Sequence, residues 1–114
     1  MDNSIVLFLI IAHPISSATY GVAELYGIKY GAFNLSSGET RELELGAGFL
    51  FLWDWAAQYY GVIEISYWDD TASLKWGNIT NSVSLNKSSS SKILNLGCKL
   101  SNYTCRLKYV FIGL

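Results

Sequence analysis

The sequence is poor in the residues that most metal sites and catalytic sites require. Its 114 residues include one histidine and two cysteines, and only 15% of them are charged. A structural zinc site needs four nitrogen or sulfur ligands, and a Ser-His-Asp triad needs a histidine. His13 stands beside the only proline, Pro14, at the edge of an apolar run. We therefore predict a non-enzymatic protein with no catalytic residue, no metal and no other cofactor.

Charges of both signs are few, and they are unevenly distributed along the chain. Residues 1–70 carry all nine acids and two bases, whereas residues 71–114 carry six bases and no acid. The bases stand singly and the net charge is −1, so we expect no nucleic-acid partner. Either strands from the two halves interleave and mix the charges, or the molecule has two faces of opposite charge that suit head-to-tail packing of copies.

Long hydrophobic runs are absent too. The longest uninterrupted apolar stretch, residues 5–12, is far shorter than the roughly 20 residues of a transmembrane helix, so none is predicted. Residues 1–18 fit two interpretations. They resemble a signal peptide with a cleavage site after Ala18. They also fit a strand buried on both faces, either in its own subunit or donated to a neighbour's sheet. Residues 19–114 then form a single domain.

What the sequence has in abundance is strand-forming residues. Eight Tyr, five Phe and four Trp accompany many Val, Ile and Thr, and apolar and polar positions alternate through residues 20–33, 40–55 and 59–68. Residues 34–39 and 86–92 are typical of polar turns, and Gly46-Ala47-Gly48 indicates a bend or bulge. The pattern predicts an all-β fold, a small antiparallel β-sandwich of about seven or eight short strands. A small closed barrel is the alternative.

The two cysteines lie in two alternating segments near the C-terminal end of the sequence. When residues 93–111 are folded about Ser101-Asn102, Cys98 faces Cys105, and Leu96 faces Leu107. This hairpin register puts the apolar residues on one face and brings the sulfurs together. We therefore expect a cross-strand Cys98–Cys105 disulfide, which implies an oxidising compartment.

Four Asn-x-Ser/Thr sequons also indicate an exported protein. The acceptor residues are Asn34, Asn78, Asn86 and Asn102, all placed in or beside predicted turns. Glycosylation requires an exposed acceptor in a secreted chain. Together with the cysteines and the apolar N-terminal segment, they predict an extracellular or cell-surface glycoprotein.

Aromatic residues are the candidate ligand contacts. Trp68 and Trp76 flank a polar turn, with Tyr60 and Tyr67 nearby, and exposed rings of this kind can stack on sugars. The alternation in residues 40–55 places Trp53 and Trp55 with Leu43 and Leu45 on one face, which we expect to be buried. The candidate ligand-stacking residues are therefore Tyr60, Tyr67, Trp68 and Trp76.

These features favour a secreted structural or assembly protein that self-associates through β-edges and complementary charges. At the level of class, a small secreted sandwich with an apolar N-terminal segment resembles filament subunits of the cell surface and virion-coat subunits. A small extracellular carbohydrate-binding module is the first alternative, with a glycan as its partner. A secreted effector or inhibitor that binds a protein through its loops is the second.

Overall fold

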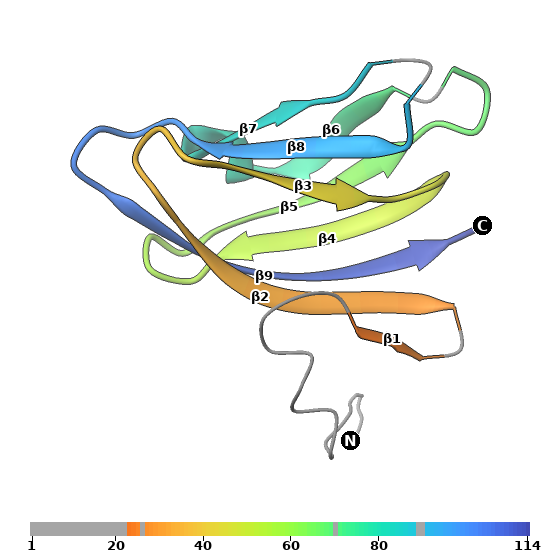
Figure 1. Cartoon of the computed structure of the whole chain (residues 1–114), viewed down its shortest axis with the longest axis horizontal. Coiled ribbons are helices and arrows are strands. Elements are labelled where there is room, and N and C mark those ends of the chain that lie inside the picture. Colours follow the sequence, from red (N-terminus) through yellow and green to blue (C-terminus); the bar gives the residue numbers. More distant parts are fainter. Residues whose placement is uncertain (1–22, 26, 70, 89–90) are drawn as a thin grey trace.

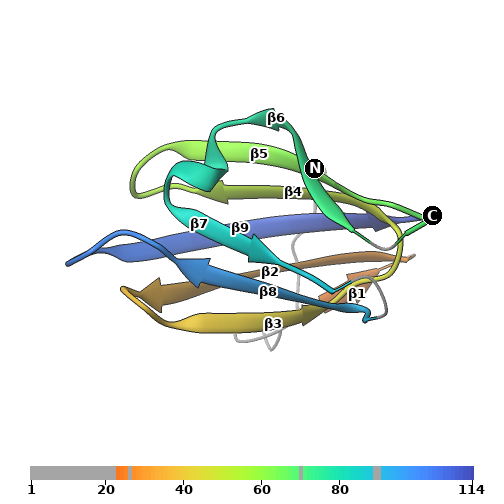
Figure 2. The ribbon, with the colours of Figure 1, turned by 90° about the horizontal axis from the view of Figure 1, so that it is seen from above.

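The computed structural model describes residues 23–25, 27–69, 71–88 and 91–114. The predicted signal peptide or donated strand at residues 1–18, with His13, lies outside the described residues. In the described part, nine strands form two antiparallel sheets that pack face to face (Figures 1 and 2). The predicted all-β sandwich is therefore confirmed.

The strand order of the two sheets mixes the two halves of the sequence. The six-stranded sheet runs in the order β1 (Ala23–Leu25), β2 (Ile28–Ser36), β9 (Thr104–Gly113), β4 (Gly48–Asp54), β5 (Tyr59–Ile65) and β6 (Ala72–Gly77). The three-stranded sheet runs β3 (Thr40–Glu44), β8 (Ile93–Cys98), β7 (Val83–Asn86), and a short 3-10 helix, η2 (Ile79–Asn81), precedes β7. Both sheets combine strands from the two halves, so the strands interleave as the first interpretation expected. The bases on second-half strands, Lys75, Arg106 and Lys108, all lie in the larger sheet.

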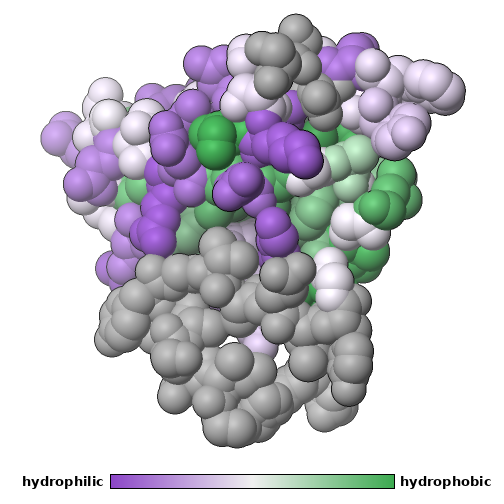
Figure 3. Space-filling view, turned by 45° about the vertical axis from the view of Figure 1, so that its right-hand side comes forward, coloured by the Kyte–Doolittle hydropathy of each residue, from purple (hydrophilic) through white to green (hydrophobic). Residues whose placement is uncertain are grey.

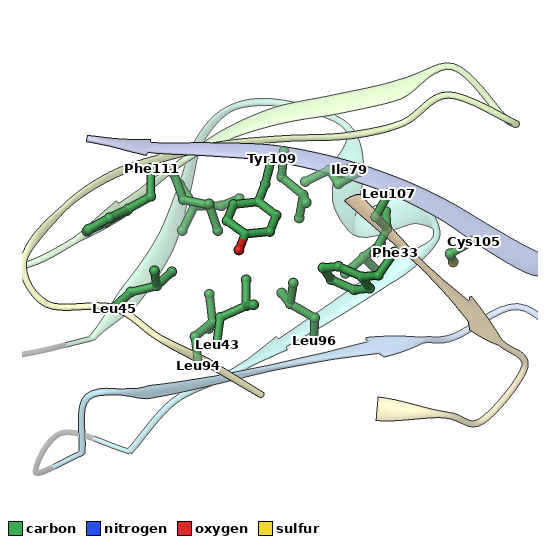
Figure 4. Close-up of a cluster of buried hydrophobic side chains, with 14 of the residues drawn as sticks. Phe33, Leu43, Leu45, Ile79, Leu94, Leu96, Cys105, Leu107, Tyr109 and Phe111 are labelled. Atoms are coloured by element: carbon green, nitrogen blue, oxygen red, sulfur yellow. The ribbon is translucent and has the colours of Figure 1, made fainter. Parts of the chain in front are cut away.

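The core lies between the two sheets. Its members are Phe33, Leu35, Leu43, Leu45, Leu50, Leu52, Ile63, Ile65, Ile79, Val83, Leu94, Leu96, Cys98, Cys105, Leu107, Tyr109 and Phe111. Figure 4 shows Tyr109 of β9 pointing across the interior toward Leu43, Leu94 and Leu96 of the smaller sheet. The Tyr109 hydroxyl is buried and has no hydrogen-bond partner among the described residues. Burial raises the pKa of Tyr109 to about 12, because the charged phenolate is poorly solvated there.

Residues 40–55 form two strands rather than one, and this reverses the predicted burial of the aromatic residues. β3 ends at Glu44 and β4 begins at Gly48, so the predicted bend at residues 46–48 is present and carries the chain from one sheet to the other. The crossing shifts the alternation by one residue. Leu50 and Leu52 point into the core, whereas Trp53 and Trp55 face solvent. The expectation that Trp53 and Trp55 are buried was wrong.

The predicted hairpin of the two cysteine segments was also wrong, because these segments, β8 and β9, do not pair with each other. β8 pairs with β3 and β7, whereas β9 pairs with β2 and β4, and residues 99–103 cross between the sheets. The alternation identified the inward side chains correctly, since Leu96, Cys98, Cys105 and Leu107 are all buried. These side chains meet across the sandwich interior, because facing sheets interdigitate as readily as paired strands align.

The outer face of the three-stranded sheet is polar. Its exposed positions include Thr40, Glu42 and Glu44 of β3 and Ser84 and Asn86 of β7. Hydrophilic residues dominate the described surface in the view of Figure 3. No helix in the described part of the chain is long and apolar enough to span a bilayer. The polar face of this sheet contrasts with the outer face of the other sheet.

Candidate functional site

Large apolar side chains cover the outer face of the six-stranded sheet. Eight of them are 36–62% exposed, and we call them the aromatic face: Ile28, Phe49, Phe51, Trp53, Trp55, Tyr60, Trp76 and Ile112. Monomeric proteins rarely expose contiguous apolar patches of more than a few hundred Å², and larger ones mark interaction sites. The aromatic face is therefore the candidate functional site.

The strand register makes this face continuous. Phe51 of β4 stands between Val110 of β9 and Val62 of β5, and Val62 is opposite Trp76 of β6. One row further along, Trp53 is directly opposite Tyr60. Side chains on directly opposed residues of an antiparallel pair lie about 5 Å apart, so each row forms a contact surface that crosses the sheet.

The two ends of the face differ in charge. At one end, the Arg106 guanidinium lies 5.5 Å and the Lys108 ammonium 5.9 Å from the centre of the Trp55 ring. At the other end, Glu64 of β5 is directly opposite Phe49 and lies 3.5 Å from the Lys75 ammonium. The centre of the face, around Phe51, is apolar. The face thus has an aromatic middle, a basic end and an end with a carboxylate.

A shallow pocket of about 640 Å³ opens on this face. Trp53, Trp55, Gln58, Tyr60 and Trp76 are among its lining residues. The rings of Tyr60 and Trp76 lie 5.0 Å apart at an angle of 35°. Exposed neighbouring rings of this kind offer an apolar platform on which a planar or ring-shaped ligand can stack.

The structure separates the four predicted stacking residues into two pairs. Tyr60 and Trp76 belong to the aromatic face. Tyr67 and Trp68 follow the end of β5 in the turn before β6, where they are 71% and 90% exposed and contact each other edge to face at 5.5 Å. β5 spans about 20 Å between the two pairs, so they cannot form one platform. Sequence reasoning missed Trp53 and Trp55. It assigned them to the core because it continued the alternation of β3 into β4 without the one-residue shift between the two strands.

A buried carboxylate fixes the end of β4, the strand that carries Phe49, Phe51 and Trp53 of the aromatic face. Asp54 is fully buried at the end of β4. Its Oδ2 accepts a hydrogen bond of 2.8 Å from the Tyr103 hydroxyl, and its Oδ1 accepts bonds of 3.1 and 3.2 Å from the backbone N–H groups of Arg106 and Ala56. Burial, followed by the hydrogen bond to Asp54, raises the pKa of Tyr103 well above its usual range. Asp54 therefore positions Trp55 and ties β4 to β9.

The two cysteines are neighbours but not bonded to each other, so the predicted disulfide is absent from the structure. Both are buried thiols. Cys105 donates to the Ser82 carbonyl at 3.5 Å, and Cys98 lies 3.7 Å from the Tyr103 carbonyl. Burial first, and then hydrogen bonding with the Cys98 thiol, raises the pKa of Cys105. The prediction that the two sulfurs come together is correct, but they meet across the interior from strands of the two facing sheets and not within one hairpin.

All four sequon asparagines are exposed. Asn34 lies within β2 rather than in a turn, and it is directly opposite Arg106 at the basic end of the aromatic face. Asn78 follows β6, and its side-chain oxygen accepts a 3.0 Å hydrogen bond from the Tyr60 N–H. Asn86 ends β7, and Asn102 occupies the turn between β8 and β9. All four side chains are therefore accessible to solvent.

Three of the sheet edges, those formed by β6, β7 and β3, are poorly suited to strand addition. β6 contains a bulge next to Val62 and ends at Gly77, and β7 has four residues. β3 has five residues, including Arg41, Glu42 and Glu44. Short, charged or bulged edge strands protect a sheet against pairing with another chain. The structure therefore favours the aromatic face over these edges as a contact surface.

Within the described residues, no group of three His, Cys, Asp or Glu side chains lies close enough to hold a metal ion. Asp69 accepts hydrogen bonds from the Thr71 hydroxyl at 2.8 Å and the Thr71 N–H at 3.2 Å, which is the role of a turn-forming residue.

No protein-family model, curated protein or solved structure matches the chain. The site must therefore be interpreted from its own geometry.

Proposed function

We propose that the chain is a secreted, non-enzymatic structural or assembly protein whose copies associate, as subunits of surface filaments or virion coats do. The observation that carries this proposal is the aromatic face, because eight partly exposed large apolar side chains on one sheet are costly to leave in water. Burying apolar surface contributes about 25 cal/mol per Å², so covering this face provides a large driving force for association.

Two further observations support an extracellular location. The four sequon asparagines are exposed, so each is accessible for glycosylation. The Cys98 and Cys105 thiols are neighbours, so an oxidising compartment would require only a short approach of the sulfurs to join them. We propose that they form a disulfide there, which would link the two sheets and contribute roughly 2–3 kcal/mol by the loop-entropy model.

Mass and size measurements test the proposal. Intact mass spectrometry of the exported protein should show the mature N-terminus, glycans removable by an endoglycosidase, and the loss of two hydrogens for the disulfide. Size-exclusion chromatography and negative-stain microscopy should show oligomers or filaments. An unmodified protein that stays monomeric at high concentration contradicts it.

A carbohydrate-binding module is the second candidate, favoured by the Tyr60–Trp76 platform beside the pocket. Sugar rings stack on such platforms, and the neighbouring side chains of Gln58 and Asn78 could hydrogen-bond sugar hydroxyls. A monomeric protein whose tryptophan fluorescence shifts on adding an oligosaccharide, and whose Trp76→Ala variant loses that shift, would establish this function over assembly.

A further inference from the structure

We infer that the aromatic face packs against the same face of a second copy, so that two sandwiches form a four-layered dimer. This inference rests on the proposed function and specifies its surface and partner. The occupant of such a face must be chosen from its area, its chemistry and its symmetry, and all three favour another copy of this chain.

The exposed area is the size that a stable dimer requires. The eight side chains are 36–62% exposed. Because a whole aromatic side chain presents roughly 150–250 Å², their exposed surface is on the order of 700 Å² before the rim is added. A standard protein–protein interface buries about 800 Å² on each partner. Together with its rim, the face is therefore about the size of one side of a standard interface.

The chemistry of the face fits a protein surface better than a sugar. Phe51, with Val62 and Val110 on either side, occupies the centre and offers no side-chain hydrogen-bonding group. A bound glycan would leave hydroxyl groups unpaired over this centre, which is unfavourable. An interface core made of Phe, Trp and Tyr, with Arg and Glu at its rim, has the composition typical of protein–protein contacts.

The arrangement of charges is compatible with two-fold symmetry. A two-fold axis that lies across the strands exchanges the ends of the face, so the end with Arg106 and Lys108 in one copy covers the end with the Glu64–Lys75 ion pair in the other, and the two basic ends are kept apart. Two sheets packed in this way lie about 10 Å apart with their strands within about 30° of alignment, which is the geometry that sandwiches already use internally.

Sedimentation of the purified full chain and three variants tests the inference. Phe51→Lys places a charge at the centre of the face, and Trp76→Ser removes a ring from its side. Trp68→Ser is the matched control, since it makes the same change at a 90% exposed tryptophan in the turn after β5. The measurement is the dimer dissociation constant over about 0.1–100 μM, because interfaces of this size start at micromolar affinity.

We expect the unmodified protein to dimerise, Phe51→Lys and Trp76→Ser to raise the dissociation constant about 30-fold or more, and Trp68→Ser to change it by less than about 3-fold. Circular dichroism and the urea midpoint check that each variant folds. If the protein associates but Phe51→Lys and Trp76→Ser do not weaken it, the face is not the interface, while the proposed assembly function stands. A protein that is monomeric at about 100 μM overturns both proposals.

Discussion

Replacing Asp54 should strongly destabilise the sandwich, because its single carboxylate is the acceptor for three hydrogen-bond donors. The side chain is fully buried and accepts three hydrogen bonds. In Asp54→Ala, the exposed Ala56 N–H can bond water instead, but the Arg106 N–H and the Tyr103 hydroxyl lose their acceptor in two partly buried hydrogen bonds. Each donor left without a partner costs about 1–3 kcal/mol, so we expect a loss of about 3 kcal/mol in the free energy of unfolding.

Equilibrium urea denaturation followed by tryptophan fluorescence measures this loss. Tyr103→Phe removes one of the three donors and should cost about 1.5 kcal/mol, the lower end for a hydrogen bond to a charged group. The double variant should be close to Asp54→Ala alone, because the hydroxyl has already lost its partner. A double-mutant cycle therefore isolates the 2.8 Å hydrogen bond. A loss below about 1 kcal/mol in Asp54→Ala, or fully additive single effects, would refute the assigned role.

Three further predictions concern Tyr109, Gly77 and the two cysteines. Tyr109→Phe should raise the free energy of unfolding in urea by about 1 kcal/mol, because it removes a hydroxyl that is buried without a partner. Since burial raises the pKa of Tyr109 to about 12, the unmodified protein should lose stability as the pH rises from about 10 to 12, and the variant should lose less. Gly77→Ala should cost about 2 kcal/mol or more in the same assay, since its φ is +102° and a Cβ would lie 2.2 Å from the Tyr60 carbonyl oxygen. In the reduced protein, Cys98 and Cys105 should react with a thiol reagent much more slowly than in urea, because both are buried; equal rates would contradict that burial.

The sequence predicted the fold class, but it could not assign the faces of every strand. Alternation identified Leu96 and Leu107 as inward correctly, because polar residues or glycine flank them: Asn95 and Gly97 beside Leu96, and Arg106 and Lys108 beside Leu107. In residues 48–55 both faces carry large apolar side chains, and the face with Asp54 looked like the polar one. Three hydrogen bonds compensate that buried carboxylate, so the residues beside it, Leu50 and Leu52, form the core. Period alone does not reveal such compensation.

The candidate site was therefore predicted only in part. Tyr60 and Trp76 were identified from their positions near turns, and they do lie on the aromatic face. Tyr67 and Trp68 are likewise one tyrosine and one tryptophan, but they belong to a turn beyond the end of β5. The sequence also did not reveal that β8 and β9 belong to different sheets. The same alternation of inward and outward residues fits both a hairpin and a chain that crosses from one sheet to the other.

The central place of β9 has a consequence for how the molecule is made. β9 lies between β2 and β4, and its partner β2 is about seventy residues earlier in the sequence, which is a highly non-local pairing. Until residues 104–113 have been synthesised, β2 and β4 lack the strand that joins them, and the larger sheet cannot close. The larger sheet therefore forms only once β9 is available, and its closure should be slower than that of a sheet built from neighbouring strands.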